Sequence, residues 1–169
     1  MDADAIDLVL LAFRVLVGGV MIAHGYGHIF RGGKIEGTGR WFESLGMRPG
    51  ILHAWLASLT ELGGGVLLVL GLLTPFAGGA VIGVMVVAWI TAHRTNGFFI
   101  FNEGQGWEYV AVLTGCGLVL ATLGPGGWSL DNALDLWMPV PGRDGLVIGA
   151  LAGFGGAAGL LGGFWRPNR

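Results

Sequence analysis

Cysteine is nearly absent from this sequence, because Cys116 is the only thiol among 169 residues. A single thiol cannot form an internal disulfide, a C-x-x-C redox pair or a four-thiolate iron–sulfur site. Any electron transfer that involves the chain therefore requires a bound cofactor or a partner protein.

Charge is also scarce. Asp, Glu, Lys and Arg make up 12% of the residues, and the formal net charge is only −2. We expect no nucleic-acid partner for such a chain. A basic amino-terminal segment is missing as well, since the chain opens with MDADAID, so we expect no cleaved signal peptide and a retained first hydrophobic segment.

Apolar residues and glycine fill the chain instead. Hydrophobic residues make up 53%, the mean hydropathy is +0.70, and there are 34 glycines. A helix needs about 20 mostly apolar residues to cross the hydrocarbon core of a bilayer. The composition predicts an all-α integral membrane protein surrounded by lipid, with five transmembrane helices. The apolar stretches are residues 6–29, 54–73, 75–92, 107–123 and 145–165.

The distribution of cations predicts an orientation. Five spans place the loops 31–53 and 94–106 on one side of the membrane together with the carboxyl terminus. That side carries seven of the nine Lys and Arg residues, and the opposite side has only Arg143. The seven are Arg31, Lys34, Arg40, Arg48, Arg94, Arg166 and Arg169. Because cytoplasmic loops are rich in cations, we expect a cytoplasmic carboxyl terminus, in the inner membrane of a bacterial cell.

The loop 31–53 and the last apolar stretch differ from the remaining segments. In the loop, Thr38 can cap a short helix that lies along the membrane interface. In the stretch 145–165, glycines at 145, 149 and 153, and again at 155, 159 and 163, form two small-residue edges that allow close helix approach. Two edges suggest two neighbours, one of which can be another protein chain. We therefore divide the chain into a four-helix membrane domain, 1–136, and a linker with an extra glycine-rich helix, 137–169.

Two charges lie deep within the predicted spans. Arg14 is ten residues before His24, and Glu61 is ten residues after Ile51. At 1.5 Å per residue the two side chains should reach the same depth, and a buried ion pair would lower their cost in the bilayer. The pair can be structural, or Glu61 can titrate as part of a proton or substrate site.

Polar residues gather near one end of several spans. His24 and His28 end the first span, and His93 shares a helical face with Met85 and Trp89. Asn96, Glu108 and Tyr109 follow at the same level. We expect His24 to face the bundle, and His28 to lie nearer the water and to be dispensable.

Several kinds of site remain open for these residues. His24 or His28 opposite His93 can ligate a b-type haem. A zinc site from His24, His28, His93 and Glu108 matches no established spacing, so we expect no metal. Each histidine can equally be a polar residue without a ligand. An aromatic-lined pocket with a few polar groups best suits a lipid-soluble ring such as a quinone, and haem b is the less favoured cofactor.

The order of these motifs identifies a resemblance. "AHGYGHIF", "GTGRWFESLGMRPG", "TELGGGVLLVLGLLTP", "AHRTNGFFIFNEGQGWEYV" and "GPGGWSLDNAL" resemble the DoxX family of small membrane proteins, most closely its actinobacterial and mycobacterial members, up to about Leu136. The resemblance implies a four-helix membrane core. It also implies a link to a thiosulfate:quinone oxidoreductase and to a mycobacterial membrane complex that handles oxidative and thiol stress.

The resemblance also marks candidate site residues. The family's polar motif positions correspond here to His24, Glu61, His93, Asn96, Glu108 and Tyr109. With Trp89, these residues form the expected quinone-binding set. We expect a subunit of an oxidoreductase assembly, possessing a cytoplasmic-side pocket for a quinone or a similar apolar redox ligand. The alternative is a structural or accessory subunit of a larger membrane complex, or a small-solute carrier.

Overall fold

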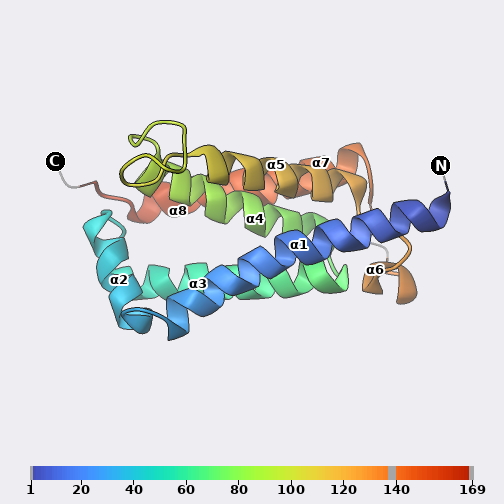
Figure 1. Ribbon diagram of the computed structural model, residues 1–169, viewed down its shortest axis with the longest axis horizontal. Helices are drawn as coiled ribbons and strands as arrows, with labels where there is room; N and C mark the ends of the chain where they lie inside the picture. Colours follow the sequence, from blue (N-terminus) through green and yellow to red (C-terminus); the bar gives the residue numbers. More distant parts are fainter. Residues whose placement is uncertain (1, 137–139, 168–169) are drawn as a thin grey trace.

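Long apolar helices make up most of the chain, as the composition predicts (Figure 1). The computed structural model describes residues 2–136 and 140–167, and this part of the chain contains no strand. The helices are α1 (Ala3–Phe30), α2 (Lys34–Ser44), α3 (Gly50–Leu70), α4 (Thr74–Ala88), η1 (Trp89–His93), α5 (Glu108–Leu123), α6 (Leu130–Ala133), α7 (Arg143–Ala150), η2 (Leu151–Gly155) and α8 (Gly156–Phe164).

Four continuous helical segments are long and apolar enough to cross a membrane. They are Ala3–Phe30, Gly50–Leu70, Thr74–His93 and Arg143–Phe164, and α5 is an apolar helix of 16 residues. The prediction of an all-α membrane protein is confirmed. The last of the four contains the predicted extra helix, and the shorter α5 occupies the place of the predicted fourth span.

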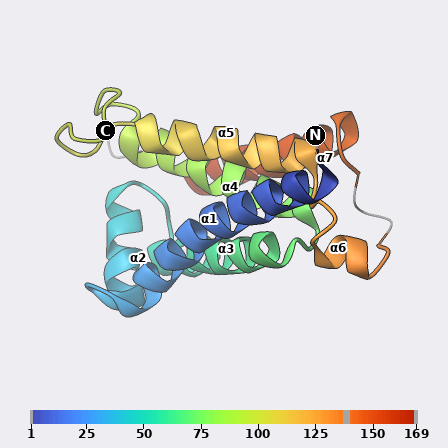
Figure 2. The ribbon, with the colours of Figure 1, turned by 45° about the vertical axis from the view of Figure 1, so that its right-hand side comes forward.

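The helices form two layers. In Figure 1, α1 and α3 lie side by side, and α4, α5, α7 and α8 lie together opposite them. Figures 1 and 2 both place α2, the loop 94–107 and the carboxyl terminus at one end, with the amino terminus and α6 at the other. Six of the seven cations counted above belong to residues at the α2 end, and Arg169 lies outside the described residues.

Glycine sets the register between α1 and α3. A Cβ atom on Gly18 would lie 2.6 Å from the carbonyl oxygen of Gly65, and one on Gly25 would lie 2.8 Å from that of Ser58. Only glycine allows two helix backbones to approach this closely. The contact fixes which residues of α1 and α3 lie at the same depth.

This register does not bring Arg14 and Glu61 together. The Arg14 guanidinium lies near the end of α3, where it donates to the carbonyl of Leu68 at 3.5 Å and to that of Trp128. Leu68 is seven residues beyond Glu61, about 10 Å along the helix. Both side chains are buried, as expected, but the predicted ion pair is not formed. Equal distances counted from the helix ends missed this, because the glycine contacts displace the two helices relative to each other.

A short loop covers the Arg14 end of the bundle. The buried Asp131 accepts hydrogen bonds from the backbone amides of Leu73 and Thr74, at 2.9 and 3.2 Å, and from the Thr74 hydroxyl. Its negative charge also attracts Arg14. These contacts attach the loop after α5 to the turn between α3 and α4.

The carboxyl-terminal helix packs into the bundle along one glycine edge. Cβ atoms on Gly149 and Gly153 would each lie 2.6 Å from side chains of α5 and α4, those of Ala121 and Ile82. On the other edge, Gly155, Gly159 and Gly163 have nothing within 4 Å of such an atom among the described residues. The first edge therefore makes α7, η2 and α8 part of the same bundle, and the second is open.

The α2 end is closed by contacts from the chain terminus. The Trp165 indole donates to the carbonyl of Leu45 at 3.0 Å, and the Arg166 amide donates to that of Gly46 at 2.8 Å. The helix α2 begins at Lys34, four residues before the predicted cap, and Thr38 lies within it, where its hydroxyl contacts the carbonyls of His28 and Lys34. α2 therefore bridges α1, α3 and the end of α8.

Candidate functional site

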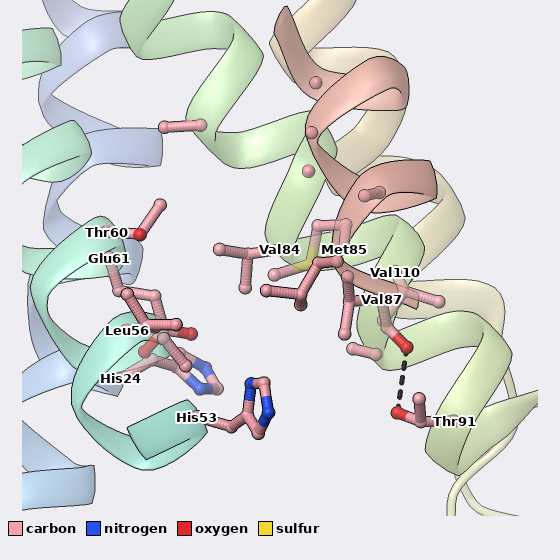
Figure 3. Close-up of a pocket in the computed structure, with 18 of the residues that line it drawn as sticks. His24, His53, Leu56, Thr60, Glu61, Val84, Met85, Val87, Thr91 and Val110 are labelled. Atoms are coloured by element: carbon pink, nitrogen blue, oxygen red, sulfur yellow. Dashed lines mark hydrogen bonds between the residues drawn. The ribbon is translucent and has the colours of Figure 1, made fainter. Parts of the chain in front are cut away.

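A cavity of about 510 Å³ lies between the two helix layers, toward the α2 end. Figure 3 shows His24, His53 and Glu61 on the α1/α3 side, opposite Val84, Met85 and Thr91 of the other layer. Residues of α2, the loop 94–107, α5, η2 and α8 complete the lining. Cavities of this size with mostly apolar walls and a few polar groups are typical of small-molecule sites.

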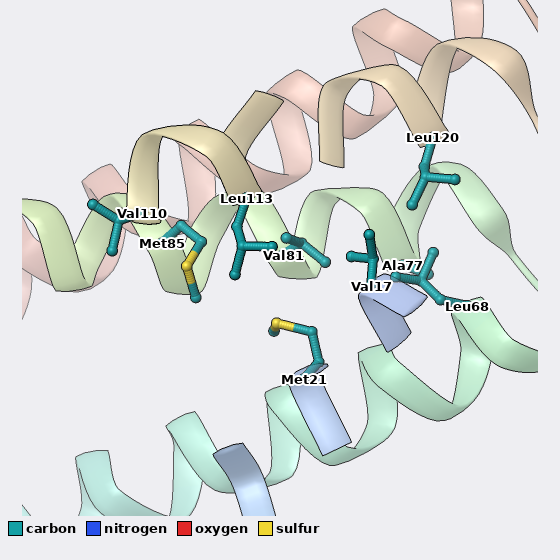
Figure 4. Close-up of a cluster of buried hydrophobic side chains, with 9 residues drawn as sticks. All are labelled: Val17, Met21, Leu68, Ala77, Val81, Met85, Val110, Leu113 and Leu120. Carbon is teal, nitrogen blue, oxygen red and sulfur yellow. The ribbon is translucent and has the colours of Figure 1, made fainter. Parts of the chain in front are cut away.

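The apolar core closes the inner end of this cavity. Met85 belongs both to the lining and to the buried cluster that joins the two layers (Figure 4). That cluster consists of Val17, Met21, Leu68, Ala77, Val81, Met85, Val110, Leu113 and Leu120. A ligand would therefore enter from the α2 end or from the side, and it would not reach the opposite face past these side chains.

Glu61 is the buried acidic group of the cavity. It is 3% exposed, and its Oε2 atom lies 3.1 Å from Nδ1 of His28. The expectation that His28 lies nearer the water than His24 is wrong, because the His28 side chain is only partly exposed and lines the cavity, whereas His24 is an exposed residue. The reason is that α1 continues helically to Phe30, and the close approach at Gly25 places His28, one turn later, beside Glu61.

His53 was not among the expected site residues, yet its ring is 2% exposed and lines the cavity. Its Nε2 atom lies 3.4 Å from the carbonyl oxygen of Arg48, and its edge packs against Phe164 with ring centroids 5.1 Å apart. The sequence places His53 at the level of the other histidines but does not reveal which way it points. That direction depends on α8, far away in the chain.

His24 and Tyr109 contact each other at the cavity, so His24 faces the bundle as predicted. Their ring centroids are 5.9 Å apart in a stacked arrangement, and the Tyr109 hydroxyl lies 3.3 Å from Nε2 of His24. The contact joins α1 to the first turn of α5, so it holds the two layers together at the edge of the cavity.

The other expected residues divide between lining and loop. His93 lines the cavity, with Nδ1 2.9 Å from the carbonyl oxygen of Gln105. Asn96 donates to the loop carbonyls of Gly104 and Gln105, and Glu108 accepts from the Ile100 amide at 3.1 Å, so both stabilise the loop 94–107. Trp89 is 44% exposed and is not among the lining residues.

Buried polar atoms without hydrogen bonds concentrate at this cavity. Within residues 2–136 and 140–167 there are four such side-chain atoms, and three belong to lining residues: His28 Nδ1, His53 Nδ1 and Glu61 Oε2. His28 and Glu61 face each other without the alignment of a hydrogen bond. Buried polar groups in proteins normally have partners, so these atoms indicate a place where a ligand or water completes the set.

A metal centre has little support in this arrangement. The described part of the chain contains no group of three or more His, Cys, Asp or Glu side chains placed to hold a metal ion. In particular, Glu108 is turned to the backbone of its loop and does not join His24, His28 and His93.

Comparison with known proteins identifies the family to which this chain is similar. A family model described as DoxX matches residues 9–94, a range that begins within α1 and extends past the end of η1. The chain is also 30% identical over 135 residues to the uncharacterized membrane protein Rv3486 of Mycobacterium tuberculosis, covering 75% of this chain and 81% of that protein. No solved structure matches the chain. Glu61 and the cavity histidines lie within the matched range, whereas Tyr109 and the α8 wall lie beyond it.

Proposed function

Because the chain belongs to the DoxX family of membrane proteins, we propose that it is a membrane subunit of an oxidoreductase assembly whose cavity binds a quinone or a similar apolar redox ring. The observation that carries the proposal is the concentration of unpartnered buried polar atoms, His53 Nδ1 and Glu61 Oε2 among them, in a cavity with otherwise apolar walls. Such a cavity suits a flat apolar ligand that carries a few hydrogen-bonding groups.

The dimensions and the chemistry of the cavity support this ligand class. A volume of about 510 Å³ lies within the usual range for small-molecule pockets, about 300–1,000 Å³. A quinone ring supplies two-electron chemistry that the single thiol of the chain does not. Imidazole and carboxylate groups beside such a ring can take up and release its protons near neutral pH. Here Glu61 and His28 would hold one polar edge of the ring, and the His24–Tyr109 pair would flank it.

A haem b is the less favoured ligand. It requires two imidazole nitrogens free to ligate iron from facing helices. Here Nε2 of His24 contacts the Tyr109 hydroxyl, whereas His93 contacts the Gln105 carbonyl through Nδ1, so within the described residues only one of the two rings presents a free Nε2. Two rival functions use the same cavity differently. A small-solute carrier would bind its cargo there, and an accessory subunit without chemistry would leave the cavity to lipid.

Orientation and partnership belong to the same proposal. The cation-rich α2 end would face the cytoplasm of a bacterial cell, with the chain in its inner membrane. The open glycine edge at 155, 159 and 163 would receive a helix of another subunit, because small residues permit close packing in lipid.

Two glycines of α8 allow a direct test. Gly156 lines the cavity and Gly159 does not, and a Cβ atom at either position meets nothing within 4 Å. Gly156→Leu should therefore fill the cavity without disturbing the fold, and Gly159→Leu is its matched control on the open edge. We expect quinone to be extracted with the purified wild-type chain and with Gly159→Leu, and its amount to fall at least about tenfold in Gly156→Leu, the effect of filling a snug site.

Other outcomes would overturn the proposal. Equal quinone recovery from all three proteins would mean that the ligand lies outside the cavity. A Soret band in the purified protein would favour haem, and recovery of neither chromophore would favour the accessory or carrier function. Loss of co-purifying subunits in Gly159→Leu alone would support the partner surface.

A further inference from the structure

We infer that the cavity favours the reduced, hydroxyl-bearing form of its ring over the oxidised form, because two buried side chains there without a hydrogen-bond partner, Glu61 and His53, present hydrogen-bond acceptors. The inference rests on the proposed function and specifies which form of that ligand is retained. A quinone offers only carbonyl acceptors to a protein, whereas the corresponding hydroquinone offers two hydroxyl donors.

Glu61 is the first acceptor. An ionised carboxylate accepts hydrogen bonds and cannot donate them. The Oε2 atom of Glu61 lies 3.1 Å from Nδ1 of His28, and its carboxyl group also interacts electrostatically with Tyr109. Whichever of the two atoms carries the hydrogen of that contact, the remaining lone pairs of the Glu61 carboxyl group can only accept, and Glu61 lines the cavity.

His53 is the second acceptor. Its Nε2 atom faces the carbonyl oxygen of Arg48, and a carbonyl can only accept, so the hydrogen of the neutral ring belongs on Nε2. Nδ1 is then a lone-pair acceptor. This atom is buried and makes no hydrogen bond within the described chain. Figure 3 shows the ring standing in the cavity, on the same side as Glu61.

The remaining polar groups do not reverse this balance. The Thr91 hydroxyl already donates to the carbonyl of Val87 at 2.8 Å, so it presents only lone pairs to the cavity. The Tyr109 hydroxyl and His24 contact each other. The Thr60 hydroxyl can rotate to donate or to accept. Glu61 and His53 therefore remain the unpartnered buried acceptors that line the cavity, and the third unpartnered lining atom, His28 Nδ1, faces Glu61.

A preference for one form has a measurable consequence for the bound pair. If the hydroquinone binds tenfold more tightly than the quinone, the midpoint potential of the bound couple rises by about 30 mV relative to the free couple. The shift is independent of any turnover by the assembly, so it can be measured on the full chain alone.

The experiment uses the purified full chain in lipid nanodiscs under anaerobic conditions. Three probes are titrated: decyl hydroquinone, decyl quinone and the dimethyl ether of decyl hydroquinone, which keeps the ring but has no donor. We expect the hydroquinone to bind about tenfold more tightly than either of the others. Glu61→Gln and His53→Phe should each weaken the hydroquinone alone, by about tenfold, the effect of losing one hydrogen bond to a charged or buried acceptor. Glu36→Gln, on the exposed surface of α2, is the control and should change nothing.

The outcomes separate this inference from the proposed function. Gly156→Leu, which fills the cavity, serves as the reference without a ring site. If no probe binds the wild type more tightly than it binds Gly156→Leu, the cavity is not a ring site and both the proposed function and this inference fail. If all three probes bind the wild type equally, the ring site stands and the donor preference is wrong. Tighter binding of the quinone, or equal weakening of all three probes by Glu61→Gln, would also refute the preference. The comparison among probes on the wild type remains decisive even if a variant fails to fold.

Discussion

The buried guanidinium of Arg14 should be one of the largest single contributors to stability at the amino-terminal end of the bundle. Arg14→Met keeps a long apolar side chain in the same space but removes the charge and its donors. The side chain is fully buried, and it donates to the carbonyl of Trp128 and, at the long distance of 3.5 Å, to that of Leu68. The change therefore weakens the attachment of the covering loop to α3.

The size of the effect follows from these contacts. A hydrogen bond between side chains of membrane helices contributes about 0.6 kcal/mol on average, whereas one from a charged donor contributes about 1.5–3 kcal/mol. The Trp128 contact is of the second kind, and its loss also leaves the buried Asp131 without a nearby cation. We expect the free energy of unfolding to fall by about 3 kcal/mol, at the lower end of the range for breaking a buried charged pair. Asp131 keeps its three donors, which limits the loss.

The measurement is equilibrium unfolding of the purified chain in mixed micelles, followed by helical circular dichroism as the fraction of SDS is raised. Glu61→Gln provides the comparison, because Glu61 is buried on the same helix pair about 10 Å away along α3. The double variant should lose the sum of the two single effects to within about 0.5 kcal/mol. A coupling above about 1 kcal/mol would mean that the two charges interact and would contradict the register described above. A loss below about 1 kcal/mol for Arg14→Met would show that the Trp128 contact does not hold the loop.

Two further predictions concern the α1–α3 contact and the orientation of the chain. Gly18→Leu should destabilise the bundle by several kcal/mol, since even a Cβ atom would lie 2.6 Å from the Gly65 carbonyl oxygen; Gly19→Leu, which meets nothing within 4 Å, should be close to neutral in the same unfolding assay. A reporter fused after Arg169 should signal from the cytoplasm and one fused before Asp2 from outside, because the α2 end carries the cations. Signals from the same side for both fusions would contradict the five-helix arrangement.

Much of the architecture could be predicted from the sequence alone. Apolar length and scarcity of charge identify membrane helices, because a segment in lipid must satisfy its own backbone and exclude charge. The same reasoning located the extra carboxyl-terminal helix and grouped the cations at one end. His24 and Tyr109 were expected at the same level, because each is close to a helix end on the same side of the bilayer, and the structure brings them into contact.

The tertiary structure decided the partners of the buried charges and the walls of the cavity. Counting residues from the helix ends placed Arg14 and Glu61 at the same depth. The close contacts at Gly18 and Gly25 set a different register, in which Glu61 lies beside His28. His53 lines the cavity because of the way α3 begins and where α8 ends, and neither is a local property of its neighbours. Hydropathy indicates which segments lie in the membrane, and the position of a residue within its segment indicates its approximate depth. The direction in which its side chain points depends on the rotation and offset of packed helices, which are fixed by contacts between residues far apart in the sequence.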